Sequence, residues 1–168
     1  WHPVKMFPAA SFSFVSYEVD AAHSTVIFTY RVEFKSGRVR TFTDRLFFKD
    51  VGPDAWERIS KAVLEPTLQA LLLMIGINYW QAFPTKDMRI EGFALTRAQA
   101  DFWNELYLHG LGEFFYLMKI DFCDLIAFPY DETAIVPAAQ RMDLPERALL
   151  LNGAGKDSTI KHVMSGVN

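Results

Sequence analysis

Hydrophobic residues in the first third of the chain follow the short alternation that is typical of β-strands. β-Branched and aromatic residues crowd residues 12–17, 26–34 and 39–48. Turn-forming residues separate these runs, around residues 20–23 and at the pair Ser36-Gly37. The pattern predicts an antiparallel meander of three or four strands within residues 11–50.

After Gly52 the apolar positions change to the spacing of helices. Asp54 and Glu57 are placed to form a capping box, so a helix is expected to begin there. Pro66 is expected to kink or restart it, because proline lacks the N–H that a helix interior needs. The apolar run 68–80 is shorter than the roughly 20 residues of a membrane helix. We therefore expect it to be a buried core helix and expect no membrane partner.

A further helix is expected to begin at Thr96. Gln99 stands three residues later and completes a Thr-x-x-Gln cap. Glycines at 110 and 112 should end this helix before the apolar stretch that follows. Helices packed against an antiparallel meander predict the α+β fold class.

The amino-acid composition changes after residue 128. Three prolines with polar residues between them indicate an extended connector over residues 129–147. A short apolar strand, a glycine-containing loop and a helix-like segment follow in residues 148–168, as at the start of an α/β domain. We expect an α+β domain over residues 1–128, and an α/β domain that is cut short at its first strand, loop and helix, because a parallel strand needs a neighbour.

Composition narrows the classes of function. The chain of 168 residues is 51% hydrophobic and 22% charged, which is typical of a globular protein. A net charge of -3 argues against a nucleic-acid partner. The single cysteine, Cys123, excludes an internal disulfide or a multi-thiolate metal site, and it fits a reducing compartment, so a cytoplasmic location is expected. Cys123 is expected to be a small buried residue.

The strongest chemical signal is the loop after the apolar strand 148–151. Gly153 and Gly155 allow backbone N–H groups to approach a phosphate closely. The following helix would add unpaired N–H donors and its positive dipole end. Lys156 supplies a cation, and hydroxyl groups follow it. Phosphate binding is the favoured interpretation, with an ordinary strand–turn–helix as the alternative.

The loop differs from two common nucleotide motifs. The common NTPase loop needs Ser or Thr directly after Gly-Lys, but Asp157 intervenes. The dinucleotide fingerprint needs a glycine where Ser158 stands. The loop resembles the Ser-Gly-Gly-x-Asp-Ser loop of PP-loop ATP pyrophosphatases, with Gly153 and Ala154 in place of its first Ser and Gly. This resemblance implies ATP and Mg²⁺ as cofactors, bound by Gly153, Gly155, Lys156, Asp157, Ser158 and Thr159.

A wider resemblance rests on three segments that occur in order. They are LMIGINYWQA at 73–82, LYLHGLGEFFY at 106–116 and LNGAGKDS at 151–158. Together they resemble the N-terminal part of the bacterial UDP-N-acetylmuramoyl-L-alanyl-L-glutamate epimerase family. The resemblance implies an ATP-dependent isomerase of peptidoglycan precursor synthesis. It would activate the terminal L-Glu of a nucleotide-linked precursor as an acyl-adenylate, epimerise it to D-Glu, and release AMP and pyrophosphate.

Residue roles are less defined than the reaction class. Asn78, Tyr79 and Gln81 are polar groups that end a hydrophobic helix, and they are candidates for substrate binding. Glu113 is a further candidate, because a buried acid in so apolar a stretch needs a partner; a helix-start cap is its alternative. The histidines share no ligand spacing, so no metal site is expected. The sequence does not indicate which residue is the catalytic base.

Two other interpretations stay open. The chain could be a non-enzymatic module that binds a ligand or a protein, or part of a different PP-loop ATP pyrophosphatase. On the epimerase interpretation, the remainder of the PP-loop domain is expected downstream and the 168 residues alone are expected to be inactive.

Overall fold

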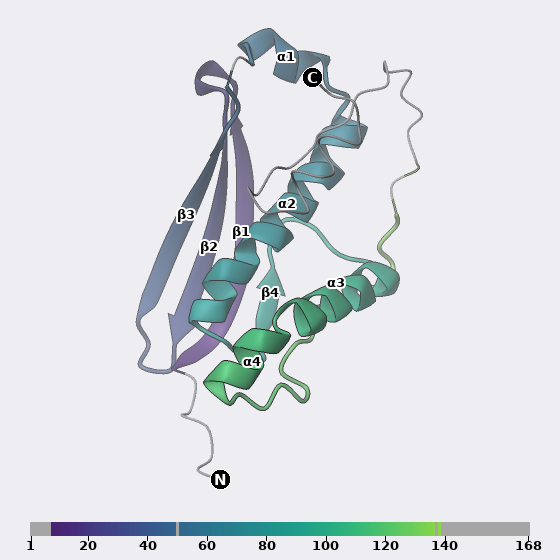
Figure 1. Cartoon of the computed structure of the whole chain (residues 1–168). Helices are drawn as coiled ribbons and strands as arrows, with labels where there is room; N and C mark the ends of the chain where they lie inside the picture. The colour runs from purple at the N-terminus through teal and green to yellow at the C-terminus, as the bar shows by residue number, and fades with distance from the viewer. Residues whose placement is uncertain (1–7, 50, 137, 139–168) are drawn as a thin grey trace, which may run out of the picture. The chain divides into compact units, whose positions relative to one another are not determined.

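The computed structural model is a mixed α+β structure, described for residues 8–49, 51–136 and 138. A four-stranded sheet forms one layer, and α2, α3 and α4 lie together on one side of it (Figure 1). The expected α+β class is confirmed.

The sheet contains the predicted meander and one additional strand. β1 (Ala9–Asp20), β2 (Thr25–Phe34) and β3 (Val39–Phe47) pair antiparallel in sequence order. The second turn falls at Ser36-Gly37 as expected, with Gly37 at a φ of +81°, which glycine adopts without steric cost. β4 (Met88–Ile90) pairs parallel to β1 and gives the order β3-β2-β1-β4. A three-residue strand carries too short a pattern to be predicted.

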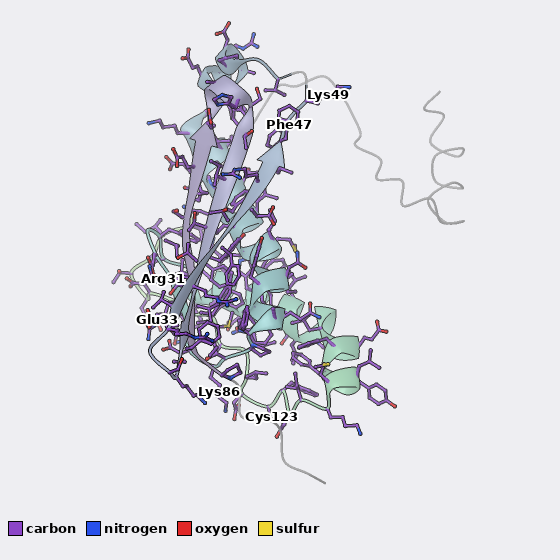
Figure 2. The ribbon with its side chains drawn as sticks, turned by 90° about the vertical axis from the view of Figure 1, so that its left-hand side faces the viewer. Arg31, Glu33, Phe47, Lys49, Lys86 and Cys123 are labelled. Atoms are coloured by element: carbon purple, nitrogen blue, oxygen red, sulfur yellow. The ribbon has the colours of Figure 1, made fainter. Side chains whose placement is uncertain are left out.

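The two faces of the sheet differ as the alternation requires. The helix-facing side chains of β2 are all buried: Val26, Phe28, Tyr30, Val32 and Phe34. On the opposite face, Arg31 and Arg89 form ion pairs with Glu33 at 3.8 and 3.5 Å; Figure 2 labels Arg31 and Glu33. Ser11 and Ser13 of β1 lie beside Glu33 and Arg31 in the sheet. Their hydroxyls are buried without a hydrogen-bond partner among the described residues.

Helix α1 (Pro53–Arg58) begins two residues before the start that a cap at Asp54 predicts. Its N-cap is Gly52, and no side chain caps it, so the predicted capping box of Asp54 and Glu57 is wrong. Proline at the first helical position already fixes φ and has no N–H to satisfy, which explains why the helix begins there. Asp54 instead lies in the first turn.

Helix α2 (Lys61–Ala82) continues through Pro66, so the helix does not restart at this residue, and a kink there stays a prediction. The break between the two helices falls at Ile59 and Ser60 instead. Pro66 is near the exposed start of α2, where the carbonyl of Ala62 that loses its partner can bond to water. The cost of the proline is therefore small.

The apolar run of α2 packs on the sheet as expected. Its buried residues are Leu68, Leu72, Leu73, Gly76 and Trp80. By length and composition alone this 22-residue helix, with a mean hydropathy of 1.3 in its most apolar window, could cross a membrane, but a buried core helix passes the same test. In the described residues, 22% of that window is buried, and α2 packs on β1 and β2.

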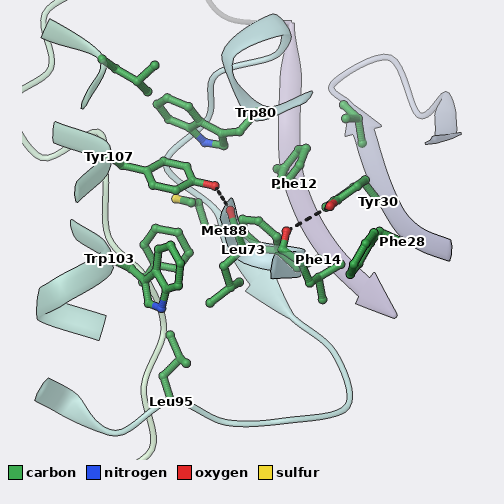
Figure 3. Packing of buried hydrophobic residues seen from close by; sticks show 14 of the residues in the cluster. Phe12, Phe14, Phe28, Tyr30, Leu73, Trp80, Met88, Leu95, Trp103 and Tyr107 are labelled. Atoms are coloured by element: carbon green, nitrogen blue, oxygen red, sulfur yellow. Dashed lines mark hydrogen bonds between the residues drawn. The ribbon is translucent and has the colours of Figure 1, made fainter. Parts of the chain in front are cut away.

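Helices α3 (Arg97–Gly110) and α4 (Gly112–Met118) cover α2 from the other side. Thr96 accepts from the backbone of Gln99, and the Gln99 side chain accepts from the Thr96 backbone, so this predicted capping box is confirmed. The two glycines separate the helices as expected. Figure 3 shows Tyr107 of α3 donating a hydrogen bond to the backbone carbonyl of Leu73, at 2.6 Å.

The chain after α4 returns to the start of α3. The backbone N–H of Asp131 donates to the carbonyl of Leu95 at 2.9 Å. Residues 129–136 contain neither helix nor strand. The division into a domain at 1–128, a connector at 129–147 and a further domain from 148 stays a prediction.

Candidate functional site

The predicted ATP loop lies outside the described residues. Gly153, Gly155, Lys156, Asp157, Ser158 and Thr159 all belong to the stretch 139–168. Phosphate and Mg²⁺ binding by this loop therefore stays a prediction, and the geometry that follows concerns the other candidate residues.

Tyr79 lies between α2 and the sheet. Its ring stacks on Tyr30 with 4.8 Å between ring centroids and lies 5.4 Å from that of Phe42. Its hydroxyl donates to the Asp44 carboxylate at 3.3 Å. Burial and the nearby carboxylate raise the pKa of Tyr79, so the hydroxyl keeps its proton. Tyr79 is therefore part of the packing between α2 and β3, with only a partly accessible hydroxyl.

Asn78 and Gln81 belong to the same last turns of α2. Asn78 is exposed and Gln81 is half-buried. Neither side chain forms a hydrogen bond with another described residue. These two amides are thus free to bind a ligand, whereas Tyr79 is already engaged.

Glu113 lies in the first turn of α4 and is exposed. The prediction that Glu113 is a buried acid is therefore wrong. Glu113 does not cap the helix either, because α4 has no side-chain cap. Its charge at the N-terminal end of a helix is favourable. Trp80 of α2 lies 6.5 Å from Phe115 of α4, so Glu113 comes from an element adjacent to the end of α2.

Cys123 is exposed, so the prediction that it is buried is wrong. It follows α4 in a turn, where its backbone N–H donates to Asp121 at 3.0 Å. Its hydrogen bond with the Asp121 carboxylate raises the pKa of the thiol, which disfavours a nucleophilic thiolate at neutral pH. Within residues 8–49, 51–136 and 138, no three His, Cys, Asp or Glu side chains are grouped as metal ligands.

Sequence reasoning missed the role of Asp44. Phe42 and Asp44 face α2 from β3, the side of the strand on which apolar residues are expected. An acid at an inward position of a strand was the available signal, because such an acid needs a partner. The structure supplies one in Tyr79.

A groove beside the start of α3 was also missed. It has a volume of about 130 Å³, and we call it the β4–α3 groove; its lining residues are Ile90, Phe93, Ala94, Leu95, Pro129, Tyr130 and Asp131. The lining comes from two segments more than 30 residues apart, which explains why no local motif indicated it. Arg97 lies over the Tyr130 ring at 4.5 Å and forms an ion pair with Glu132 at 2.5 Å.

The architecture defines the class of protein: an α+β domain in which one sheet carries its helices on one side. The chain belongs to the MurL N-terminal domain family, whose model matches residues 5–164. A relative from Xanthomonas oryzae pv. oryzae, a UDP-N-acetyl-alpha-D-muramoyl-L-alanyl-L-glutamate epimerase, is 32% identical over 108 residues. That match covers 64% of this chain and 24% of the relative. No solved structure matches the chain.

Proposed function

We propose that this chain is the N-terminal part of an ATP-dependent epimerase of peptidoglycan precursor synthesis. The enzyme would convert the terminal L-Glu of UDP-N-acetylmuramoyl-L-Ala-L-Glu to D-Glu. The observation that supports this most strongly is the family match over residues 5–164, joined to an epimerase relative. Because the chain spans about a quarter of that relative's length, we assign turnover to the longer protein and expect the 168 residues alone to be inactive.

The proposed reaction balances without a redox step. A carboxylate oxygen of the terminal glutamate attacks the α-phosphorus of ATP, and the bond to the β-phosphate breaks with release of pyrophosphate. Loss of the carboxylate charge makes the α-proton more acidic. A general base removes this proton and an acid returns one on the opposite face. Water then releases AMP and the free D-glutamyl product.

ATP and Mg²⁺ are proposed to bind at the loop of residues 153–159. Gly153 and Gly155 would expose backbone N–H groups to the phosphates, and Lys156 would neutralise the developing charge. Asp157 is the carboxylate suited to Mg²⁺, which prefers oxygen ligands, while Ser158 and Thr159 would donate hydroxyl hydrogen bonds. The described residues offer no alternative group of three metal ligands.

Asn78, Gln81 and Glu113 are proposed as contacts for the precursor. Asn78 and Glu113 are exposed, and no described residue occupies the hydrogen-bonding groups of any of the three side chains. Tyr79 would act on the substrate less directly, because its hydroxyl is bonded to Asp44. A cytoplasmic location is proposed because the cosubstrate is ATP and the single cysteine fits a reducing compartment.

The test is AMP formation by the complete gene product with ATP, Mg²⁺ and the precursor. Lys156→Ala should abolish AMP release. Lys61→Ala, which removes an exposed lysine at the start of α2, is the matched control and should keep normal activity. Equal AMP formation by both variants would exclude the proposed loop function. If the protein never responds to ATP but is thermally stabilised by an apolar ligand or partner, the non-enzymatic binding module is favoured.

A further inference from the structure

The β4–α3 groove is not used by the proposed adenylation chemistry, yet its shape and polarity suit a ligand. We infer that it binds the heteroaromatic base of a nucleotide. A ring N–H or amino group of the base would donate a hydrogen bond to the groove. The choice of a nucleotide rests on the proposed function, in which both the UDP-linked precursor and ATP carry such a base. The description of the groove itself does not depend on that function.

The volume of the groove fits one ring. The groove, at about 130 Å³, approaches the volume of an apolar cavity of roughly 150 Å³ that holds one benzene ring. A base fits this space, whereas a sugar–peptide does not. The walls include the rings of Phe93 and Tyr130, and aromatic side chains are the usual stacking partners of bases.

The walls are held in place by bonds outside the groove. β4 pairs with β1 below Ile90, and the Asp131 N–H to Leu95 carbonyl bond joins the two lining segments. The Arg97 guanidinium over the Tyr130 ring adds a cation–π contact. A ligand would therefore meet a largely preformed site, with little ordering cost on binding.

Asp131 provides the one carboxylate of the lining. Its Oδ1 accepts from the backbone N–H and the hydroxyl of Thr133, both at 2.7 Å, and Oδ2 has no partner among the described residues. The same hydrogen bonds lower the pKa of Asp131, so the carboxylate is ionised and can only accept. The ligand must therefore supply a donor, as the N3–H of uracil or the amino group of adenine does.

The charge around the groove selects the base and not the phosphates. Arg97 is already paired with Glu132, and Asp101 also lies close enough to act on it. The charge of Arg97 is thus offset, and the lining itself adds the carboxylate of Asp131. A nucleoside should therefore bind at least as tightly as its monophosphate.

Titration of the 168-residue chain by ¹H–¹⁵N NMR tests the inference. The probes are uridine, 3-methyluridine, adenosine and N6,N6-dimethyladenosine. Uridine or adenosine should shift the amides of residues 90–95 and 130–131, and the corresponding methylated nucleoside should bind about tenfold more weakly because its donor is blocked. A response to uridine assigns the groove to the precursor, and a response to adenosine assigns it to ATP.

Variants connect the response to the groove. Asp131→Asn removes the charge at nearly constant volume and should weaken binding about tenfold. Tyr130→Ala should also weaken it, whereas Phe102→Ala, at an exposed aromatic outside the groove, should not.

Three results would overturn the inference. They are no groove shifts with either nucleoside, unchanged affinity for the methylated nucleosides, and a response to N-acetyl-arginine amide alone, which would indicate a basic side chain as the occupant. The measurement needs no turnover. Loss of AMP formation would therefore exclude the proposed function without affecting this result.

Discussion

On its sheet side, α2 approaches β1 and β2 so closely that Gly76 leaves no room for a side chain. A Cβ at this position would lie 2.4 Å from Phe14 and 2.9 Å from Tyr30. On its other side, α2 meets α3 and α4 through ring contacts, such as the edge-to-face pair of Trp80 and Tyr107 with 6.0 Å between centroids. Beyond that contact, α4 leaves Tyr116 82% exposed.

On both sides, a buried tyrosine hydroxyl donates a hydrogen bond to a backbone carbonyl of α2. Tyr30 from the sheet donates to the Leu72 carbonyl at 3.0 Å, and Tyr107 from α3 donates to the Leu73 carbonyl at 2.6 Å. Adjacent turns of α2 are therefore fixed from both sides. Close packing limits substitutions on the sheet side, while the α3–α4 side retains surface and a groove for binding.

The largest expected effect is that of Gly76→Ala. Alanine is the better helix former by about 1 kcal/mol, but its methyl group would overlap the buried ring of Phe14. Overpacking of this kind costs about 1–3 kcal/mol and should exceed the gain in helix propensity. Urea unfolding followed by circular dichroism should show a lower midpoint with an unchanged m-value.

Gly110→Ala is the matched control for this substitution. Gly110 ends α3, and nothing lies within 4 Å of an added Cβ. The same chemical change should therefore be neutral or slightly stabilising. Equal loss of stability in both variants would show that the close approach at Gly76 does not determine the packing.

The second prediction compares the two buried tyrosines. Tyr30→Phe and Tyr107→Phe each remove one hydroxyl bond to an α2 carbonyl and should lower the free energy of unfolding by about 0.5–1.5 kcal/mol. The double variant should lose the sum within about 0.5 kcal/mol if the two sides act independently. A larger deviation in this double-mutant cycle would mean that α2 transmits strain between its two faces.

The third prediction concerns high pH. Burial raises the pKa of Tyr30, Tyr79 and Tyr107 above the usual value of about 10. Their stabilising contribution is complete below the unfolded-state pKa. It is lost as pH rises from about 10 toward the raised folded-state pKa, because only the unfolded chain ionises readily.

Chemical unfolding at pH 8, 10 and 11 measures this effect. Stability should fall above pH 10, and the fall should be smaller in Tyr107→Phe than in the wild type. Tyr116→Phe, at an exposed residue, should follow the wild-type profile. Identical profiles for Tyr107→Phe and Tyr116→Phe would contradict the role of the buried hydroxyl.

The smallest effect is expected on the surface of α4. Leu117 and Met118 are 64% and 62% exposed, so Leu117→Ser and Met118→Ser should change stability by no more than about 0.5 kcal/mol. Thermal unfolding checks this. A large loss in either variant would show that the α3–α4 side is as closely packed as the sheet side.

Much of the fold could be predicted because its signals are local. The alternation in β2, the Ser36-Gly37 turn and the Thr96 cap each lie within one element, and the structure has all three. The break between α1 and α2 could not be predicted by the rule that proline breaks helices. Pro66 lies near an exposed helix start, where a lost hydrogen bond is replaced by water.

The candidate site was less predictable because it depends on pairs that are distant in the sequence. Tyr79 was identified as a polar residue at a helix end, but its partner Asp44 lies 35 residues earlier. Asp131 was read as part of a connector, although its backbone joins Leu95 beside the groove. Burial was also misjudged at Cys123, because one apolar neighbour does not define an interior position.

The most direct test of the central claim, membership of an ATP-dependent epimerase, is turnover by the complete gene product in D₂O. UDP-N-acetylmuramoyl-L-Ala-L-Glu would be supplied with ATP and Mg²⁺, and AMP, D-Glu and α-deuterium would be quantified together. The account predicts equal amounts of AMP and D-Glu, with deuterium at the α-carbon of the product and no D-Glu without ATP. Epimerisation without ATP, or formation of ADP in place of AMP, would contradict it.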